Sequence, residues 1–204
     1  MPSVPTSARE GPPIPARLEG ARPVRLEPPL HRVRRVVLVG FMGSGKSAVG
    51  RRLARRLGWR FADMDREIVV RDGRSIVRIF REDGESFFRR LEADTARQLL
   101  QEVEVVISTG GGWPCREGRL ETLDSETLAV WLMVSAEGAV ERISDSRIRR
   151  PLLEVADPLA EARRLLAERE MYYSLAHWHI RTEGRSSSSI AREIAGRLGE
   201  SSSG

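Results

Sequence analysis

The apolar residues of this chain gather in short runs that are separated by longer amphipathic stretches. Three runs are almost continuously apolar and rich in β-branched residues, which is typical of strands buried on both faces of a sheet. They cover residues 36–39, 103–107 and 128–134. Two further segments, 59–62 and 177–181, are predicted to be shorter strands.

The segments between these strands have helical spacing or begin with residues that cap helices. Helices are predicted over 46–57, 84–101, 136–143, 158–176 and 186–198, with shorter helices over 66–82. Because strands and helices alternate, the sequence predicts a parallel sheet with helices on both faces. We therefore expect an α/β fold, a three-layer α/β/α domain over residues 33–200 with a central five-stranded parallel sheet.

The positive charge of the chain is concentrated at its N-terminus. Residues 1–35 hold seven arginines against three glutamates, a net +4 of the +5 for all 204 residues, together with eight of the eleven prolines. Such a segment buries too little apolar surface to fold, so 1–32 is expected to be a disordered tail. A nucleic-acid or acidic partner remains an alternative. Because the tail has no interleaved aromatic residues, we expect a solvated extension without a dedicated nucleic-acid partner.

The remaining composition indicates a soluble enzyme or binding domain. Apolar residues make up 40% of the chain, and no apolar run is long enough for a membrane helix. The single cysteine, Cys115, excludes an internal disulfide, and no secretory segment precedes the domain. We expect a cytoplasmic monomer without a membrane partner, and a frayed end over 201–204.

The segment 40–47 fits the pattern G-x-x-x-x-G-K-[ST] between a predicted strand and a predicted helix. In this context the backbone N–H groups of the loop cradle phosphates, while Lys46 reaches the β- and γ-phosphates and Ser47 ligates Mg²⁺. Nucleotide binding is assigned to Gly43, Ser44, Gly45, Lys46, Ser47 and Ala48. The alternative is a chance glycine-rich turn. Lys46 is the only lysine, so the Asn-Lys-x-Asp element of guanine-specific proteins is absent from the sequence and ATP is expected.

Asp63 and Asp65 follow the second predicted strand. In an extended segment, side chains two apart point the same way, so both carboxylates are expected to face one site. One would support Mg²⁺, and the other would accept a proton or hydrogen bond from a substrate hydroxyl. The alternative is that they cap the next helix.

Two more elements suit a small anionic substrate. Arg89 and Glu92 lie three residues apart on a predicted helix, so they share one face of it. The Glu92 carboxylate can then orient the Arg89 guanidinium toward the carboxylate of a substrate. The alternative is that the two residues form only a surface ion pair. Gly110, Gly111 and Gly112 follow the strand 103–107, and three glycines there allow close approach of backbone to a ligand. The arginine-rich segment 144–153 is predicted to be a lid loop, or else a solvated basic loop.

These motifs together resemble the shikimate kinases, which have a nucleoside-monophosphate-kinase-like P-loop fold. The resemblance covers about 33–200. Its marks are 40–47, Asp63-x-Asp65, Phe88-Arg89-x-x-Glu92, Gly110–Gly112, Arg150-Pro151-Leu152-Leu153 and Arg169 ahead of Tyr172-Tyr173. The resemblance implies an enzyme that transfers the γ-phosphoryl group of ATP to the 3-hydroxyl of shikimate in aromatic amino-acid biosynthesis.

The resemblance also implies roles for individual residues. Lys46, Asp65 and Arg150 are the implied catalytic residues, with Asp65 as the base and Arg150 in the lid. Ser47 and Asp63 hold Mg²⁺, and Arg142 stacks on adenine. Shikimate is bound by Asp65, Arg89, Gly110, Gly111, Gly112 and Arg169, with the two arginines on its carboxylate.

Three features depart from the family pattern. The predicted lid also contains Arg147 and Arg149, which are alternatives to Arg150 as the lid arginine. Trp113-Pro114-Cys115 stands where small residues are usual, and it either reshapes the pocket floor or packs beneath it. The spacing from Arg169 to Ala176 is about one residue shorter than expected. The alternatives are therefore a related kinase for another small polyol acid or a nucleoside monophosphate, and a regulatory ATP-binding module that uses the basic tail.

Overall fold

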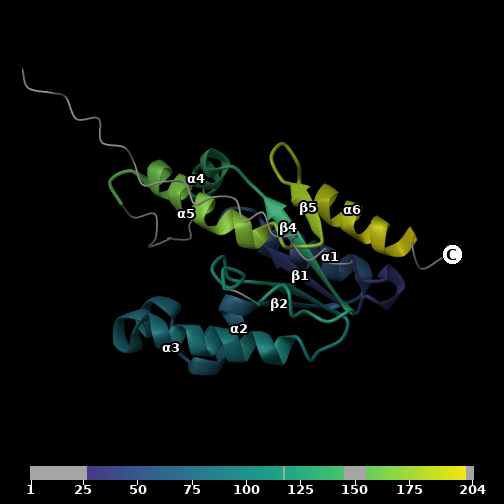
Figure 1. The fold of residues 1–204 in the computed structure, drawn as a ribbon, viewed down its shortest axis with the longest axis horizontal. Coiled ribbons are helices and arrows are strands. Elements are labelled where there is room, and N and C mark those ends of the chain that lie inside the picture. The colour runs from purple at the N-terminus through teal and green to yellow at the C-terminus, as the bar shows by residue number, and fades with distance from the viewer. Residues whose placement is uncertain (1–26, 117, 145–154, 201–204) are drawn as a thin grey trace, which may run out of the picture.

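The computed structural model describes residues 27–116, 118–144 and 155–200. Its centre is a five-stranded parallel sheet with the strand order β2-β3-β1-β4-β5 (Figure 1). The strands are β1 (Arg35–Val39), β2 (Arg60–Asp63), β3 (Val105–Ser108), β4 (Thr127–Met133) and β5 (Trp178–Arg181). The predicted α/β fold and five-stranded parallel sheet are thus confirmed.

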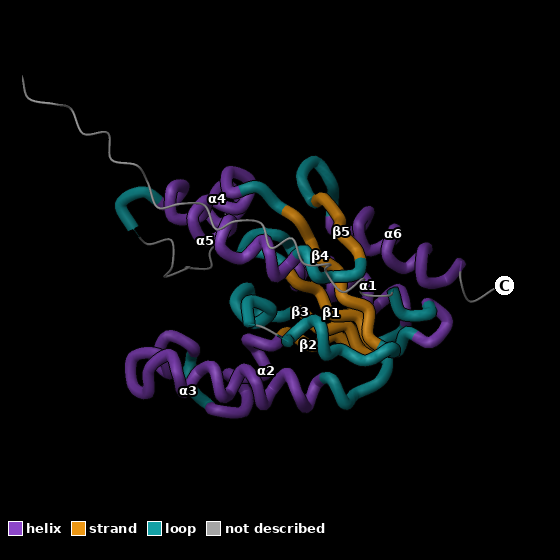
Figure 2. The backbone as a smooth tube through the Cα atoms, viewed as in Figure 1, coloured by secondary structure: helices purple, strands orange, loops and turns teal. Residues whose placement is uncertain are grey.

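Helices cover both faces of this sheet, as Figure 2 shows in purple around the orange strands. They are α1 (Lys46–Leu57), α2 (Met64–Asp72), α3 (Ile76–Leu99), α4 (Ala136–Ser144), α5 (Pro158–Tyr173) and α6 (Ser187–Glu200). In the described part of the chain, none of these helices combines the length and apolar character needed to span a membrane.

Alternate side chains of β1 enter two separate cores. Val36 and Leu38 pack with residues of α1 and α6 on one face of the sheet. Val37 and Val39 pack on the other face with residues of α2, α3 and α5. All four are almost completely buried, which explains why the sequence of this central strand is uniformly apolar.

The helices around Gly84 agree with the prediction of short helices over 66–82 followed by a longer helix from Gly84. Helix α2 ends at Asp72, and α3 (Ile76–Leu99) is divided by Gly84, which has the non-helical angles φ 77° and ψ 178°. A residue without a Cβ adopts such a conformation readily, so the chain changes direction there and a second helical segment follows.

The residues that precede β1 contact the domain. Leu30–Arg32 form one turn of 3₁₀ helix, and Leu30 packs against the core beneath α1 and α6. The indole N–H of Trp178 in β5 donates to Glu27 Oε1 at 2.9 Å. Most of the predicted tail, residues 1–26, lies outside the described residues, as do 201–204.

Candidate active site

The glycine-rich loop at 40–47 connects β1 to α1, as the sequence predicted. Gly40 has φ 137°, and a Cβ there would lie 2.5 Å from the carbonyl oxygen of Leu132 in β4. Gly43 has φ 75°, and its Cβ would lie 2.9 Å from the carbonyl oxygen of Ala139 in α4. Any side chain at these two positions would push the loop off the sheet edge. The glycines therefore fix the loop against the carboxyl end of the strands.

The Lys46 side chain folds back over this loop. Its ammonium donates to the carbonyl oxygens of Gly40 at 2.8 Å and Phe41 at 2.9 Å, and lies 3.4 Å from Ser44 Oγ. A compact ammonium with three donors fits between these acceptors, whereas a planar guanidinium would be too wide. The positive charge is thereby held at the concave side of the loop.

Ser47, Asp63 and Ser108 form a cluster of oxygen atoms beside the loop. Ser47 Oγ donates to Asp63 Oδ2 at 2.5 Å and lies 3.3 Å from Ser108 Oγ. Asp63 is the N-cap residue of α2, yet its side chain makes no capping hydrogen bond. The carboxylate instead faces α1, so the capping alternative is wrong for Asp63. Ser108 was not predicted as a site residue; its only sequence signal is a hydroxyl at the end of a buried strand.

This cluster suits a magnesium ion bound together with nucleotide phosphates. Residues 27–116, 118–144 and 155–200 contain no group of three or more His, Cys, Asp or Glu side chains that could hold a metal ion alone. Mg²⁺ in phosphoryl-transfer sites takes hard oxygen ligands and usually only one or two carboxylates, with phosphates and water completing its shell. The hydroxyl of Ser47 and the carboxylate of Asp63 therefore fit this ion.

The two aspartates do not share an extended segment, so that part of the prediction is wrong. Asp63 ends β2, while Asp65 belongs to the first turn of α2. The chain turns between them because α2 begins at Met64. Asp65 nevertheless points toward the triple glycine, since a Cβ on Gly110 would lie 3.1 Å from Asp65 Oδ1 and 3.0 Å from Glu92 Oε1.

Arg89 is held by two glutamates on α3. Its Nη1 donates to Glu92 Oε2 at 2.9 Å, and its Nε and Nη2 donate to Glu85 Oε1 at 3.1 and 3.0 Å. Glu92 is only 3% exposed, so the pair is not a surface ion pair. Burial raises the pKa of Glu92, and the charge of Arg89 opposes this shift. A Cβ on Gly112 would lie 3.1 Å from Arg89 Nη1, which places the guanidinium beside the glycine cluster.

Arg169 approaches the same cluster from α5. A Cβ on Gly111 would lie 3.8 Å from Arg169 Nη1, and the guanidinium carbon of Arg169 is 5.9 Å from the centroid of the Phe41 ring. The phenol of Tyr173, one turn further along α5, donates to the Gly111 carbonyl at 2.6 Å. The structure thus brings Asp65, Arg89 and Arg169 together around the glycines that follow β3.

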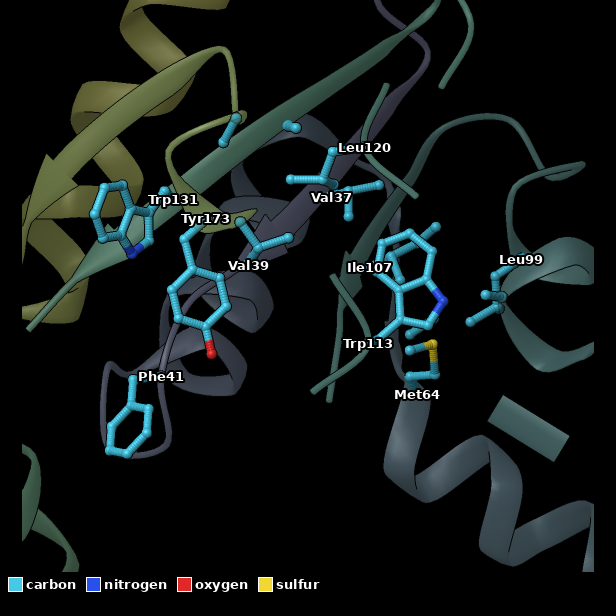
Figure 3. Close-up of a cluster of buried hydrophobic side chains, with 14 of the residues drawn as sticks. Val37, Val39, Phe41, Met64, Leu99, Ile107, Trp113, Leu120, Trp131 and Tyr173 are labelled. Carbon is cyan, nitrogen blue, oxygen red and sulfur yellow. The ribbon is translucent and has the colours of Figure 1, made fainter. Parts of the chain in front are cut away.

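The bulky residues after the glycines do not occupy this site. Trp113 is 2% exposed and packs in the core near Met64 and Leu99 (Figure 3). The side chain of Trp113 therefore packs in the core. Cys115 lies close behind, with Sγ 3.6 Å from the Gly111 carbonyl oxygen. Burial raises the pKa of the Cys115 thiol, which makes it a weak nucleophile.

Arg142 and Arg150 are the two remaining residues that the sequence predicted for the site. Arg142 of α4 donates to the Gly43 carbonyl at 3.2 Å and to Thr182 Oγ1 and the Thr182 carbonyl, each at 2.9 Å. Its guanidinium therefore lies next to the phosphate-binding loop and the end of β5. Arg150 and most of the predicted lid loop belong to 145–154, outside the described residues.

A family model described as "Shikimate kinase" matches residues 42–198, a range that contains 42–47 of the phosphate-binding loop, both aspartates, Arg89, the triple glycine and Arg169. The chain belongs to the shikimate kinase family. A shikimate kinase from Persephonella marina is 40% identical over 166 residues, which is 81% of this chain and 99% of that protein. The corresponding protein of Thermus thermophilus is 40% identical over 183 residues, 90% of this chain and 95% of its own length.

Solved structures agree with this membership of the shikimate kinase family. A shikimate kinase from Acinetobacter baumannii in complex with shikimate matches with a TM-score of 0.77 and 33% sequence identity. The match covers 84% of this chain and 96% of that one. The family and the fold therefore both agree with the prediction made from the motifs.

Proposed function

We propose that this protein transfers the γ-phosphoryl group of ATP to the 3-hydroxyl of shikimate, giving shikimate 3-phosphate and ADP. The observation that carries the proposal is the convergence of Asp65, Arg89 and Arg169 on the triple glycine. A small cyclic acid with several hydroxyls needs cations for its carboxylate and acids or backbone groups for its hydroxyls. The site offers both in one group of residues beside the phosphate-binding loop, since a Cβ on Gly111 would lie 3.6 Å from the Gly40 carbonyl oxygen.

In this proposal Arg89 and Arg169 bind the shikimate carboxylate, and Gly110–Gly112 line the ring. Glu92 fixes the orientation of Arg89 before the substrate arrives, so less side-chain freedom is lost on binding. The carboxylate thereby directs the opposite side of the ring toward Asp65. Asp65 accepts the proton of the 3-hydroxyl as its oxygen attacks the γ-phosphorus.

The nucleotide is held by Gly43 to Ala48, and Lys46 stabilises the charge on the β- and γ-phosphates. Ser47 and Asp63 are the proposed residues for Mg²⁺, which when bound neutralises charge on the phosphate oxygens. Arg142 lies beside the loop and is the proposed partner of adenine. Arg150 is proposed to close over the phosphates, which limits the competing hydrolysis of ATP.

We further propose a cytoplasmic monomer that has no dedicated nucleic-acid or membrane partner. Its basic segment 1–32 is proposed to be an appended tail rather than part of the kinase domain, with 201–204 as a frayed end. The single cysteine supports a reducing compartment.

A steady-state assay of ADP release tests the proposed reaction. With Mg·ATP, we expect shikimate to raise ADP release far above the hydrolysis background, while gluconate and AMP leave it at background. These two compounds represent the alternative substrates, another polyol acid and a nucleoside monophosphate. If gluconate or AMP stimulates ADP release and shikimate does not, the proposal is wrong.

Arg89→Ala is expected to raise the KM for shikimate by about 30-fold or more while leaving kcat nearly unchanged. Truncating a partly buried guanidinium removes binding energy that the ground state and the transition state share. Initial rates at varied shikimate give both constants. The neighbouring Arg90→Ala, on the exposed side of α3, is the matched control and should behave as wild type. A large fall in kcat at constant KM would contradict the binding role of Arg89.

A further inference from the structure

A cavity of about 280 Å³ lies between the C-terminal half of α3 and the segment that leads into β4. Its lining includes Ala93, Leu100, Gln101, Trp113, Arg119 and Leu123. Among the described residues, none of the proposed substrate-binding or nucleotide-binding side chains lines this cavity. Its volume lies close to the lower end of the range for small-molecule sites, so it could hold a compact metabolite.

Arg119 brings a positive charge to this cavity. Its guanidinium carbon is 5.7 Å from the centroid of the Trp113 ring, and the residue is partly buried. Its side chain has no hydrogen bond or ion pair with any other described residue. The other charged groups of the lining do have partners, because Arg97 pairs with Asp94 and Asp124 pairs with Arg35. The charge of Arg119 acts on Glu92, but no carboxylate of a described residue is hydrogen-bonded to the guanidinium, so its donors are suited to receive an anion.

Trp113 supplies a second unsatisfied polar group next to the cavity. Its indole Nε1 is the one buried side-chain polar atom without a hydrogen-bond partner in the described part of the chain. Figure 3 shows the nitrogen-bearing edge of the ring turned toward Leu99 of α3, the helix that also forms one wall of the cavity. Native proteins leave few buried donors unpaired, and such a donor often marks an absent water or ligand.

We propose that the cavity behind Trp113 is a second binding site that takes a small cyclic carboxylate. The carboxylate pairs with Arg119, and the ring packs against the apolar walls formed by Ala93, Leu100 and Leu123. This ligand class follows from the combination of the Arg119 guanidinium with Trp113 and aliphatic side chains in a lining that also contains Gln101, Thr122 and Thr127. A bare inorganic anion would leave those walls unfilled.

The site is connected to the proposed substrate site by two short routes. Trp113 directly follows Gly112 in the chain, and a Cβ built on Gly112 would lie 3.1 Å from Arg89 Nη1. The charge of Arg119 also acts on Glu92, where it opposes the effect of burial on the pKa. An anion bound to Arg119 would cancel this effect, so the ionised form of Glu92, which orients Arg89, would be less favoured. Occupancy should therefore weaken shikimate binding, a consequence that rests on the proposed function.

Nuclear magnetic resonance of protein labelled with ¹⁵N-tryptophan tests the binding directly. The chain has four tryptophans, so the indole spectrum is simple, and Trp113→Phe identifies the Trp113 signal. Sodium benzoate is the probe, benzamide is its uncharged analogue, and saturating shikimate is present so that the substrate site is occupied. We expect benzoate, and not benzamide, to shift the Trp113 signal saturably.

Variants then test the residues named in the proposal. Arg119→Met should weaken benzoate binding by at least about tenfold, because a charge-assisted hydrogen bond is lost. The exposed Arg116→Met, three residues earlier, is the matched control and should bind as wild type. Ala93→Leu fills the cavity and should abolish the shift. Thermal melts verify that each variant is folded.

Three results would overturn the proposal: equal benzoate affinity in Arg119→Met, an equal response to benzamide, or loss of the shift when shikimate saturates. The last would mean that benzoate binds at the substrate carboxylate site. Steady-state kinetics without benzoate test the proposed function separately from the second binding site. If the proposed function is right, wild type and Arg119→Met should both phosphorylate shikimate, whatever the benzoate titrations show. With benzoate, the KM for shikimate should rise in wild type but not in Arg119→Met.

Discussion

Lys46→Ala is expected to lower the kcat for shikimate phosphorylation by about 1000-fold or more while leaving the protein folded. The ammonium lies within the glycine-rich loop, bonded to the carbonyl oxygens of Gly40 and Phe41. In this loop its role is to stabilise the charge that develops on the β- and γ-phosphates during transfer. Initial rates at saturating ATP and shikimate measure the effect, and a thermal melt verifies the fold.

Lys46→Arg tests the geometric part of this argument. The substitution keeps the positive charge, but a planar guanidinium cannot occupy a position bounded by acceptors at 2.8 and 2.9 Å. We therefore expect the arginine variant to be almost as inactive as the alanine variant. Retention of more than about a tenth of wild-type kcat would show that charge alone suffices and that the fit of the ammonium is unimportant.

The central strands could be predicted because their burial is complete. β1, β3 and β4 lie between neighbouring strands and beneath helices on both faces, so nearly every position must be apolar. The start and end of α1 were also predictable, since the motif fixes Lys46 at its beginning and Gly58 ends it with φ 71°. Local sequence therefore determined the scaffold and the nucleotide loop.

Positions that depend on tertiary packing could not be predicted. Arg35 was counted with the basic N-terminal segment, yet it belongs to β1 and is only 5% exposed. Its guanidinium donates to Thr127 Oγ1 at 2.9 Å and to Asp124 Oδ2 at 2.7 Å, residues about ninety positions away. In the sequence, a charged residue next to an apolar run looks like the residue before a strand, because the partners that stabilise it, Thr127 in β4 and Asp124 before β4, are distant in sequence.

The site shows the same division between local and distant information. The aspartate pair and the Arg89–Glu92 pair were predictable from spacing, although the geometry assumed for Asp63 and Asp65 was wrong. The contact of Tyr173 with Gly111 joins α5 to the segment after β3, whereas Arg119 and Trp113 meet within that segment. Nothing in the spacing of those residues indicates them, so they emerge only when α5 and the segment after β3 are placed on the sheet.

Asp65→Asn is expected to lower kcat by about 100-fold or more, with little change in the KM for shikimate. The amide has the same shape and can still accept a hydrogen bond from a shikimate hydroxyl, but it cannot take up the proton released as the hydroxyl attacks. The side chain lies at the triple glycine, where Oδ1 would be 3.1 Å from a Cβ on Gly110, and Asp65 is not one of the residues assigned to nucleotide binding. Nucleotide binding should therefore be unaffected by the substitution.

Two measurements separate this role of Asp65 from a general loss of structure. Titration calorimetry should give the same Kd for ADP in wild type and Asp65→Asn, and the slow hydrolysis of ATP without shikimate should be unchanged. Asp94→Asn, an exposed aspartate on α3, is the matched control and should retain full kcat. If Asp65→Asn kept kcat within about threefold of wild type, proton transfer to Asp65 would contribute little, and orientation of the hydroxyl by the glycine backbone would have to account for catalysis.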